Sequence, residues 1–362
     1  MIYVHVPFCR SFCIYCGFYS EIAPEGRDAC MFGEYSRAVR EEIAARKDEI
    51  TDMPNTLYIG GGTPSVPPLS VLSGVTEALA DAGHGGPYDE FTVEANPEDI
   101  VEKGSGYVAG LRGLGVNRVS VGVQSFDDGI LKWMNRRHTA GTAMSAVRMI
   151  QDAGIENISI DLIFGIPGLG VDTWADTVET ALSLGVRHIS AYQLSVEEGS
   201  ALEDMISEGR CAEASEESCR SQYMLLCDRL ARAGFRHYEI SNFAVRGFEA
   251  VHNSAYWRRV PYVGFGPGAH SFDGRVRSWN AASLDGYGRE SEKLSSEDER
   301  IENIMLSLRT DEGMEESLLR SLCDAETVDR LVAGKSLVRT GDRLRIPEER
   351  FFVSDGIVKE LI

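Results

Sequence analysis

Short apolar segments rich in β-branched residues alternate with helical patterns through the first 200 residues of this chain. Six segments are predicted as strands, and they are Ile2–Val6, Thr56–Gly60, Phe91–Ala95, Arg118–Val123, Ile158–Gly165 and His188–Leu194. Before the fifth and sixth strands, apolar residues recur at helical spacing: Ala143, Val147 and Ile150, then Trp174, Val178, Ala181 and Leu182. Strand–helix alternation of this kind predicts a parallel sheet with right-handed crossovers and external helices. The fold class is therefore α/β, as an open six-stranded barrel or a full eight-stranded one.

Polar and glycine-rich motifs follow the predicted strands at their carboxyl ends. They read PFCRSFC, GGTPS, NPED, QSFDD, GIPG and SVEEG in chain order. In parallel α/β sheets and barrels this rim is where active sites are built. We therefore expect the functional residues to meet there.

The composition fits a globular protein whose cysteines are reduced thiols. The chain has 362 residues, 43% of them hydrophobic, and no apolar run long enough to cross a membrane. It has no basic leader before its first strand, so we expect no signal peptide and a cytoplasmic location. Thiols stay reduced in that compartment, so the eight cysteines are interpreted as metal ligands or core residues.

The formal net charge of −20 disfavours a nucleic-acid partner, because a phosphate backbone would be repelled. The most basic segment, Lys335–Arg350, is interrupted by acids, and we interpret it as a solvated surface.

We divide the chain into a core barrel at 1–200, a barrel-completing segment at 201–280 and a small helical, winged-helix-like domain at 281–362. A helix is predicted from Ala214 to Ala233, followed by Gly234. The residues on its inward face are Cys219, Tyr223, Cys227 and Leu230. We therefore assign the two cysteines to the core. In the last domain, Ile301, Ile304, Met305 and Leu308 form one helix face, and a hairpin is predicted around 339–342.

Three cysteines stand close together at the first strand end, as Cys9, Cys13 and Cys16 in CxxxCxxC. Thiolates hold iron–sulfur clusters, and three on a short loop can wrap one side of a cubane and leave the fourth iron without a protein ligand. Tetrahedral zinc is the alternative, but it would need a fourth ligand nearby. His5 is the nearest candidate, and it lies within the strand.

With this spacing after the first strand of a repeating βα chain, the sequence resembles the radical S-adenosylmethionine (SAM) superfamily. The resemblance implies a partial (β/α)6 barrel, a 4Fe–4S cluster on the three cysteines, and SAM bound at the open iron. Tyr15 matches the position that packs against adenine, and Tyr3 is also assigned to the cofactor pocket. The backbone of Gly61, Gly62 and Thr63 in GGGTPS is expected to bind the methionine ammonium and carboxylate of SAM.

Further strand-end residues match the superfamily's cofactor pocket. Glu94 in TVEANP is expected to bind ribose hydroxyls. Gln124, Arg136 and Asp161 match positions assigned to a second SAM molecule in the coproporphyrinogen-oxidase branch, and Arg137 lies beside Arg136 as an alternative.

The motifs YVHVPFC, GGGTPS, EANP, GVNRVSVGVQSF, DLIFGIPG and HYEISNFA together resemble the oxygen-independent coproporphyrinogen III oxidases and their relatives. Those oxidases have a further cysteine where Phe18 stands here and a long extension before the first strand. Both departures resemble the HemW-type haem chaperones, as does HNSAYW at 252–257. This resemblance implies that His252 is a haem ligand, because neutral imidazole is a common axial ligand.

His270 in GPGAHSF is a second candidate for haem. The spaced glycines Gly264, Gly266 and Gly268 do not form a dinucleotide site, because no strand–glycine–helix context surrounds them.

The function implied is a haem chaperone that delivers haem to haem-requiring apoproteins. The alternative is a radical enzyme that decarboxylates coproporphyrinogen III, and an RNA-modifying radical enzyme is disfavoured by the net charge. The sequence leaves open the haem recipient, the cleavage of SAM, the number of SAM molecules, homodimer formation and peripheral membrane contact.

Overall fold

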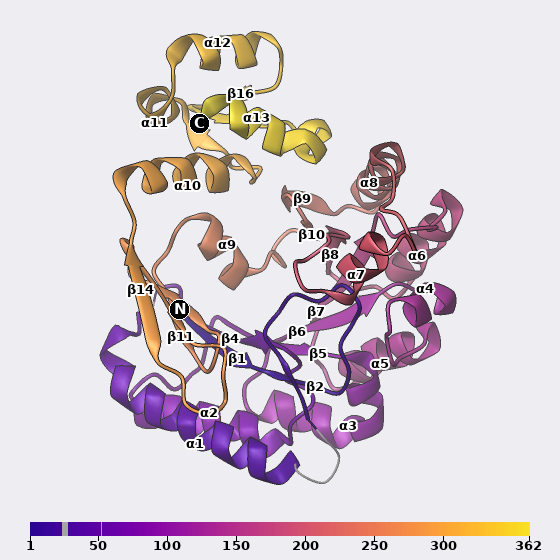
Figure 1. Ribbon diagram of the computed structural model, residues 1–362, viewed down its shortest axis with the longest axis vertical. Coiled ribbons are helices and arrows are strands. Elements are labelled where there is room, and N and C mark those ends of the chain that lie inside the picture. The colour runs from indigo at the N-terminus through magenta and orange to yellow at the C-terminus, as the bar shows by residue number, and fades with distance from the viewer. Residues whose placement is uncertain (24–27, 52) are drawn as a thin grey trace.

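The computed structural model describes residues 1–23, 28–51 and 53–362. An arc of strands lined outside by helices carries a small domain at its C-terminal end (Figure 1). The central sheet has nine strands in the order β11-β1-β4-β5-β6-β7-β8-β10-β9. Six neighbouring strands of this sheet follow one another in sequence order, namely β1 (Ile2–Val6), β4 (Thr56–Gly61), β5 (Glu90–Ala95), β6 (Arg118–Gln124), β7 (Asn157–Phe164) and β8 (His188–Gln193). These are the six predicted strands, with ends that agree within one residue, and they pair in parallel.

Three short strands extend the sheet at its edges. The strand β11 (Val263–Phe265) pairs in parallel with β1, so a segment near residue 264 returns beside the N-terminus. At the other edge, β10 (Asn242–Ala244) is antiparallel to β8 and to β9 (Arg236–Glu239). Within the described residues β11 and β9 are the two free edges, so the sheet is an open barrel.

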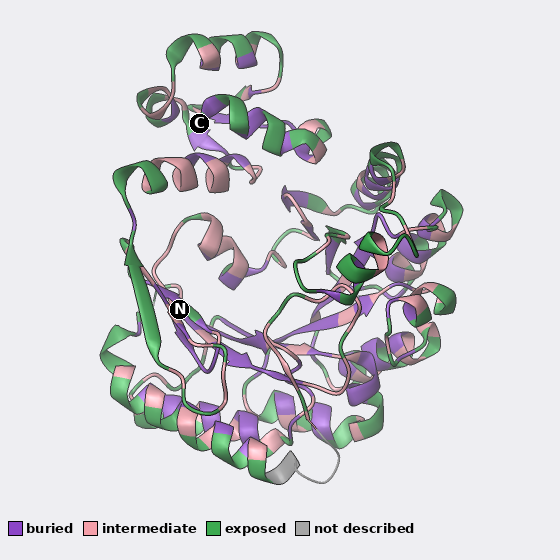
Figure 2. Cartoon of the chain, viewed as in Figure 1, coloured by how far each residue is buried: buried purple, intermediate pink, exposed green. Residues whose placement is uncertain are grey.

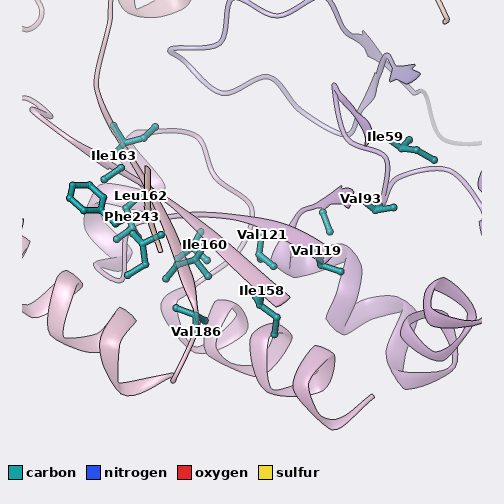
Figure 3. Close-up of a cluster of buried hydrophobic side chains, with 14 of the residues drawn as sticks. Ile59, Val93, Val119, Val121, Ile158, Ile160, Leu162, Ile163, Val186 and Phe243 are labelled. Carbon is teal, nitrogen blue, oxygen red and sulfur yellow. The ribbon is translucent and has the colours of Figure 1, made fainter. Parts of the chain in front are cut away.

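Helices cover the outer face of the sheet (Figure 1). They are α1 (Asp28–Arg46), α2 (Leu69–Asp81), α3 (Pro97–Gly113), α4 (Asp128–Trp133), α5 (Ala140–Asp152), α6 (Val171–Ser183) and α8 (Glu216–Arg232), with a short 3₁₀ helix η1 (Lys47–Glu49). Helix α7 (Ala201–Ser207) lies instead beside the loop that carries Ile14, to which Leu202 donates a hydrogen bond. Side chains alternate along each strand, so Val119 and Val121 of β6 and Ile158 and Ile160 of β7 pack on the helices (Figure 3). The predicted helix stripes are confirmed, since Val147 and Trp174 are buried.

The opposite, inner face of the sheet is polar. Ser120 of β6 donates to Asp161 of β7, and Tyr58 of β4 donates to Glu94 of β5. Alternation therefore divides each strand between an apolar outer core and a polar interior. Burial runs along the strands and the inward sides of the helices (Figure 2).

Helix α9 (Val251–Trp257), which carries HNSAYW, lies inside the arc of strands (Figure 1). In α8, Cys219 is buried and Cys227 packs against the core, so the core assignment of both is confirmed. Gly264 lies within β11, and Gly266 and Gly268 fall between β11 and β12, so no helix directly follows these glycines. A three-stranded antiparallel sheet of β12 (His270–Phe272), β13 (Val276–Asn280) and β14 (Arg289–Lys293) continues across the proposed boundary at 280.

The C-terminal domain has the helix–strand–helix–helix–strand–strand order of a winged helix. Its elements are α10 (Ser296–Leu308), β15 (Met314–Glu315), α11 (Glu316–Leu322), α12 (Ala325–Ala333), β16 (Val338–Thr340) and β17 (Arg343–Arg345), followed by a 3₁₀ helix η2 (Glu348–Val353) and α13 (Ser354–Leu361). The predicted hairpin is confirmed, because Thr340 pairs with Arg343. Ile304 and Leu308 of α10 are buried as expected. Of the helices described, none combines the length and apolarity needed to cross a membrane.

Candidate functional site

The cysteine loop begins at β2 (Phe8–Cys9) and ends at β3 (Glu21–Ile22). It is fastened on two sides. The amide of Ile14 donates to the Met134 carbonyl at 3.3 Å, and the Ile14 carbonyl accepts from the Leu202 amide at 2.8 Å. Arg10 forms an ion pair of 3.1 Å with Asp99 of α3. The loop is therefore held over the carboxyl ends of the strands by helices from different βα units.

A chain of side-chain contacts links Cys9 to Cys13 across the rim. The Cys9 sulfur lies 3.5 Å from the Thr63 hydroxyl, which accepts from the Asn96 amide at 3.3 Å. The Asn96 carbonyl oxygen accepts from Arg136 Nη2 at 2.7 Å, and Arg136 Nη1 donates to the Cys13 sulfur at 3.3 Å. The ends of β4 and β5 and the segment after α4 thus converge on the cysteines.

Arg136 brings a positive charge to the thiols. Burial disfavours its charge, but Tyr15, Cys13 and Glu98 hold its pKa above the ordinary value. Burial raises the pKa of the Cys9 and Cys16 thiols, and Arg136 acts in the opposite direction on both. Arg137 is exposed, so of the two neighbouring arginines Arg136 faces the cysteine loop.

Cys9, Cys13 and Cys16 are free thiols, and their surroundings bear on the choice between a single zinc ion and a cubane. In residues 1–23, 28–51 and 53–362, no three His, Cys, Asp or Glu side chains surround a point that could hold one metal ion. Zinc draws all of its ligands to about 2.0–2.3 Å from one centre, whereas a cubane binds each thiolate at a different corner. The His5 ring nitrogens lie 3.0 Å from the Tyr3 hydroxyl and 2.9 Å from the Tyr19 carbonyl oxygen, so His5 is not free as a fourth zinc ligand.

The glycine motif GGGTPS turns sharply at Gly61, where φ is +111°. A Cβ there would lie 2.6 Å from the His5 ring, so only glycine fits this close approach. The Gly61 amide donates to Glu94 at 3.1 Å, and the Gly62 amide donates to the Val6 carbonyl at 2.9 Å. Both amides are therefore engaged within the protein.

Glu94 lies on the inner face near the end of β5. Its second oxygen accepts from the Tyr58 hydroxyl at 2.6 Å. Burial raises the pKa of Glu94 to about 7, and the charge of Asp161 acts in the same direction. Burial also raises the pKa of Asp161, which accepts from Ser120 at 3.2 Å. These two carboxyl groups share the barrel interior.

Gln124 ends β6 in a left-handed conformation, with φ of +66°, where the register with β7 shifts. Such backbone strain in a residue other than glycine is concentrated at functional sites. A Cβ on Gly122 would lie 3.2 Å from Gln124 Nε2, 3.3 Å from Asn96 Oδ1 and 3.4 Å from Arg136 Nη2. The predicted residues Gln124 and Arg136 are thus brought together near Gly122, as is Asn96.

Tyr3 and Tyr15 occupy different parts of the interior. The Tyr3 ring stacks on Tyr58 with centroids 6.1 Å apart, beneath the rim. Tyr15 is partly buried against the core beside Arg136 and Cys13. Tyr15 therefore borders the thiols, while Tyr3 borders the Glu94 region.

His252 is fully buried in α9. Its Nδ1 lies 2.8 Å from the Thr56 hydroxyl and its Nε2 lies 2.9 Å from the Tyr256 hydroxyl. Burial lowers the pKa of His252 to about 3, so the ring is neutral at pH 7. Both ring nitrogens have hydroxyl partners, so neither is free for iron in this arrangement. His270, the second candidate, is exposed and stacks on Trp279.

Two strands connect α9 with Glu94, one of the residues predicted from the sequence to line the cofactor pocket. Glu90 of β5 accepts from the amides of Val251 at 2.7 Å and His252 at 3.0 Å. The Tyr58 ring lies 5.1 Å from the His252 ring, while its hydroxyl binds Glu94. Glu90, Tyr58, Asn96 and Arg10 were not identified from the sequence. Asn96 and Arg10 carried a signal, as parts of the strand-end motifs NPED and PFCRSFC.

Comparison with known proteins agrees with this architecture. The family model of the radical SAM superfamily matches residues 3–181. The solved structure of coproporphyrinogen III oxidase (HemN) from Escherichia coli, described as a radical SAM enzyme, superposes with a TM-score of 0.82. That match covers 99% of this chain and 89% of the other at 18% sequence identity, so it shows the fold.

Similarity over the whole chain is found with curated relatives. The heme chaperone HemW of Lactococcus lactis is 31% identical, with 99% of this chain and 96% of the relative covered. The heme chaperone HemW of Mycobacterium tuberculosis is 32% identical, with 100% and 94% covered. A mitochondrial radical S-adenosyl methionine domain-containing protein 1 from Bos taurus is 33% identical over 86% of this chain and 74% of its own length. This chain therefore belongs to the HemW family of the radical SAM superfamily.

Proposed function

We propose that this protein is a haem chaperone, which binds haem in the cytoplasm and delivers it to haem-requiring apoproteins. The observation that carries the proposal is the full-length similarity to proteins named heme chaperone HemW, at 31% and 32% identity. The absence of a cysteine at position 18, where Phe18 stands, is in keeping with it.

The family implies a 4Fe–4S cluster and SAM, and the residues described above fit both. We assign Cys9, Cys13 and Cys16 to the cluster. When bound, the cluster supplies an open iron for the amino and carboxylate groups of SAM and a source of one electron. Arg136 offsets the negative charge of the thiolates through its contact with Cys13, and Asn96 orients Arg136.

The remaining pocket residues are assigned to the organic part of SAM. Glu94, once ionised, accepts hydrogen bonds from the ribose hydroxyls. Thr63 and the carbonyls of Gly61 and Gly62 contact the methionine moiety, and Tyr15 contacts the adenine. Gln124, Arg136 and Asp161 line the adjacent space, which a second SAM molecule could share with them.

We assign His252 to haem on the strength of the HNSAYW motif. Its neutral ring is the form that binds iron, but iron ligation requires separation from Thr56 or Tyr256. Separating the His252 ring from these hydroxyls involves α9, whose first two backbone amides donate hydrogen bonds to Glu90. Haem binding at His252 therefore includes a movement of α9.

A haem titration of the anaerobically purified protein tests this function. We expect a shifted Soret band that His252→Ala weakens and His270→Ala leaves unchanged, and transfer of the bound haem to an apo-haemoprotein. A wild-type protein that leaves the haem spectrum unchanged would contradict the proposal. Formation of protoporphyrinogen from coproporphyrinogen III, SAM and a reductant would instead establish the oxidase.

A further inference from the structure

A surface cavity of about 450 Å³ lies where the barrel meets the C-terminal domain, between α8 and η2. In Figure 1, α8 faces the side of the C-terminal domain opposite the marked C-terminus. Its lining residues are Arg220, Met224, Glu349, Arg350, Phe352 and Val353. The volume lies within the range of about 300–1,000 Å³ that is typical of small-molecule sites.

The wall of the cavity is apolar and open to solvent. Met224 is 40% exposed and Val353 is 45% exposed, although both are large apolar side chains. The Phe352 ring packs on Tyr223 of α8, with centroids 5.4 Å apart, which fixes it as one side of the cavity. Met224, Phe352 and Val353 thus form the apolar wall of the cavity.

The edge of the cavity is positively charged in a protein whose net charge is −20. Arg220 makes no hydrogen bond or ion pair with any of the described residues. Arg350 donates from Nη1 to the Ser336 hydroxyl at 3.0 Å and from Nη2 to the Gly334 carbonyl at 3.5 Å, and no carboxylate among the described residues pairs with it. Glu349 is the one acidic lining residue. Two guanidinium groups beside an apolar wall suit a flat apolar ligand with carboxylate groups.

We propose that this cavity is a haem-docking site distinct from His252, an inference that rests on the proposed function. The macrocycle packs on Met224, Phe352 and Val353, and the propionates pair with Arg220 and Arg350. Met224 also offers a thioether, which haem iron accepts as an axial ligand. Haem in this position is accessible for transfer, whereas His252 is enclosed and both its nitrogens have partners.

The experiment is a haem titration of the full-length protein, followed by Soret absorbance and magnetic circular dichroism. Arg220→Gln removes one cation, and Met224→Leu removes the sulfur while keeping the apolar volume. Both residues are exposed, so the variants should fold. Arg232→Gln, on the same helix but outside the cavity, is the matched control.

We expect Arg220→Gln to weaken haem binding about threefold to fivefold, the size of an exposed ion pair. Met224→Leu should remove the thioether signature from the spectrum, and the control should match the wild type. Haem with esterified propionates should bind the wild type more weakly and should not distinguish it from Arg220→Gln. If the wild type binds haem and both cavity variants behave identically to it, the docking site is wrong while the proposed function stands. If the wild type binds no haem, the proposed function itself fails.

Discussion

Arg136 donates a hydrogen bond from its guanidinium to the sulfur of Cys13, over 3.3 Å. Arg136 also donates hydrogen bonds to the side-chain oxygen of Asn96 and to the backbone carbonyl of Gly122, each at 2.7 Å, and these contacts fix its position. A permanent positive charge is thus held at a thiol of the CxxxCxxC loop. Hydrogen bonds and charge near the sulfurs set the reduction potential of iron–sulfur clusters.

Replacing Arg136 by glutamine should therefore lower the cluster's reduction potential. The reduced cluster carries one more negative charge, and the variant lacks the cation that stabilises it. We expect a decrease of about 60 mV, which corresponds to a tenfold change in a one-electron equilibrium. A redox titration followed by electron paramagnetic resonance measures it, with the exposed Arg137→Gln as control. Equal potentials in Arg136→Gln and the wild type would remove the assigned role.

SAM binding should strengthen as pH rises through about 7. Burial raises the pKa of Glu94 to about this value, so the carboxyl loses its proton between pH 6 and pH 8. The ionised form is the better acceptor for ribose hydroxyls. Calorimetric titration with SAM at pH 6 and pH 8 should show up to about tenfold tighter binding at the higher pH. Glu94→Gln should bind weakly at both values, and an unchanged pH dependence in that variant would exclude Glu94 as its source.

Gly61→Ala should destabilise the fold. The residue has φ of +111°, and a Cβ would lie 2.6 Å from the His5 ring. Strain and the displaced ring should cost about 2–3 kcal/mol in the free energy of unfolding, measured by urea denaturation. Gly106→Ala is the contrasting control, because its Cβ would meet nothing within 4 Å inside α3. That substitution should stabilise by about 0.5–1 kcal/mol; equal effects of the two would contradict the geometry.

Acid should destabilise the protein partly through His252. Burial lowers the pKa of His252 to about 3, while an unfolded histidine keeps its ordinary value near 6.5. Between these values the unfolded chain takes up a proton that the folded chain does not, so stability falls as pH falls. The loss from His252 should be about 2 kcal/mol between pH 7 and pH 5.

His252→Gln should reduce this pH dependence in urea unfolding measured at both pH values. Part of it should persist, because burial also lowers the pKa of His237, to about 4. His270→Gln is the comparison: burial also lowers the pKa of this more exposed histidine, so the variant should remove a smaller share of the pH dependence than His252→Gln. A wild-type dependence retained in full by His252→Gln would place the titrating group elsewhere.

The six central strands were predictable because each combines β-branched residues with a polar motif at its end. The strand β11 was not, since it has three residues among glycines, and neither was β14, whose five residues are all exposed and lack alternation. Their positions depend on pairing with distant partners.

The residues of the site also divide into those that local sequence identifies and those that depend on distant contacts. Cys9, Cys13 and Cys16 were identifiable by spacing, which is local. The choice between Arg136 and Arg137 was not, because it depends on which side chain turns toward the loop after α4. The enclosure of His252 was also beyond the sequence, since Thr56 and Glu90 contact it from strands more than 160 residues away.

The proposed chemistry of this protein depends on a cubane cluster that is held by three thiolates and leaves one iron open for SAM. The most direct test is anaerobic reconstitution with iron and sulfide, followed by electron paramagnetic resonance of the reduced protein with and without SAM. We predict iron and sulfide in equal amounts, a signal that changes when SAM is added, and loss of the cluster in Cys13→Ser but not in Cys211→Ser. A colourless protein that binds a single zinc ion, or a signal that SAM leaves unchanged, would contradict the claim.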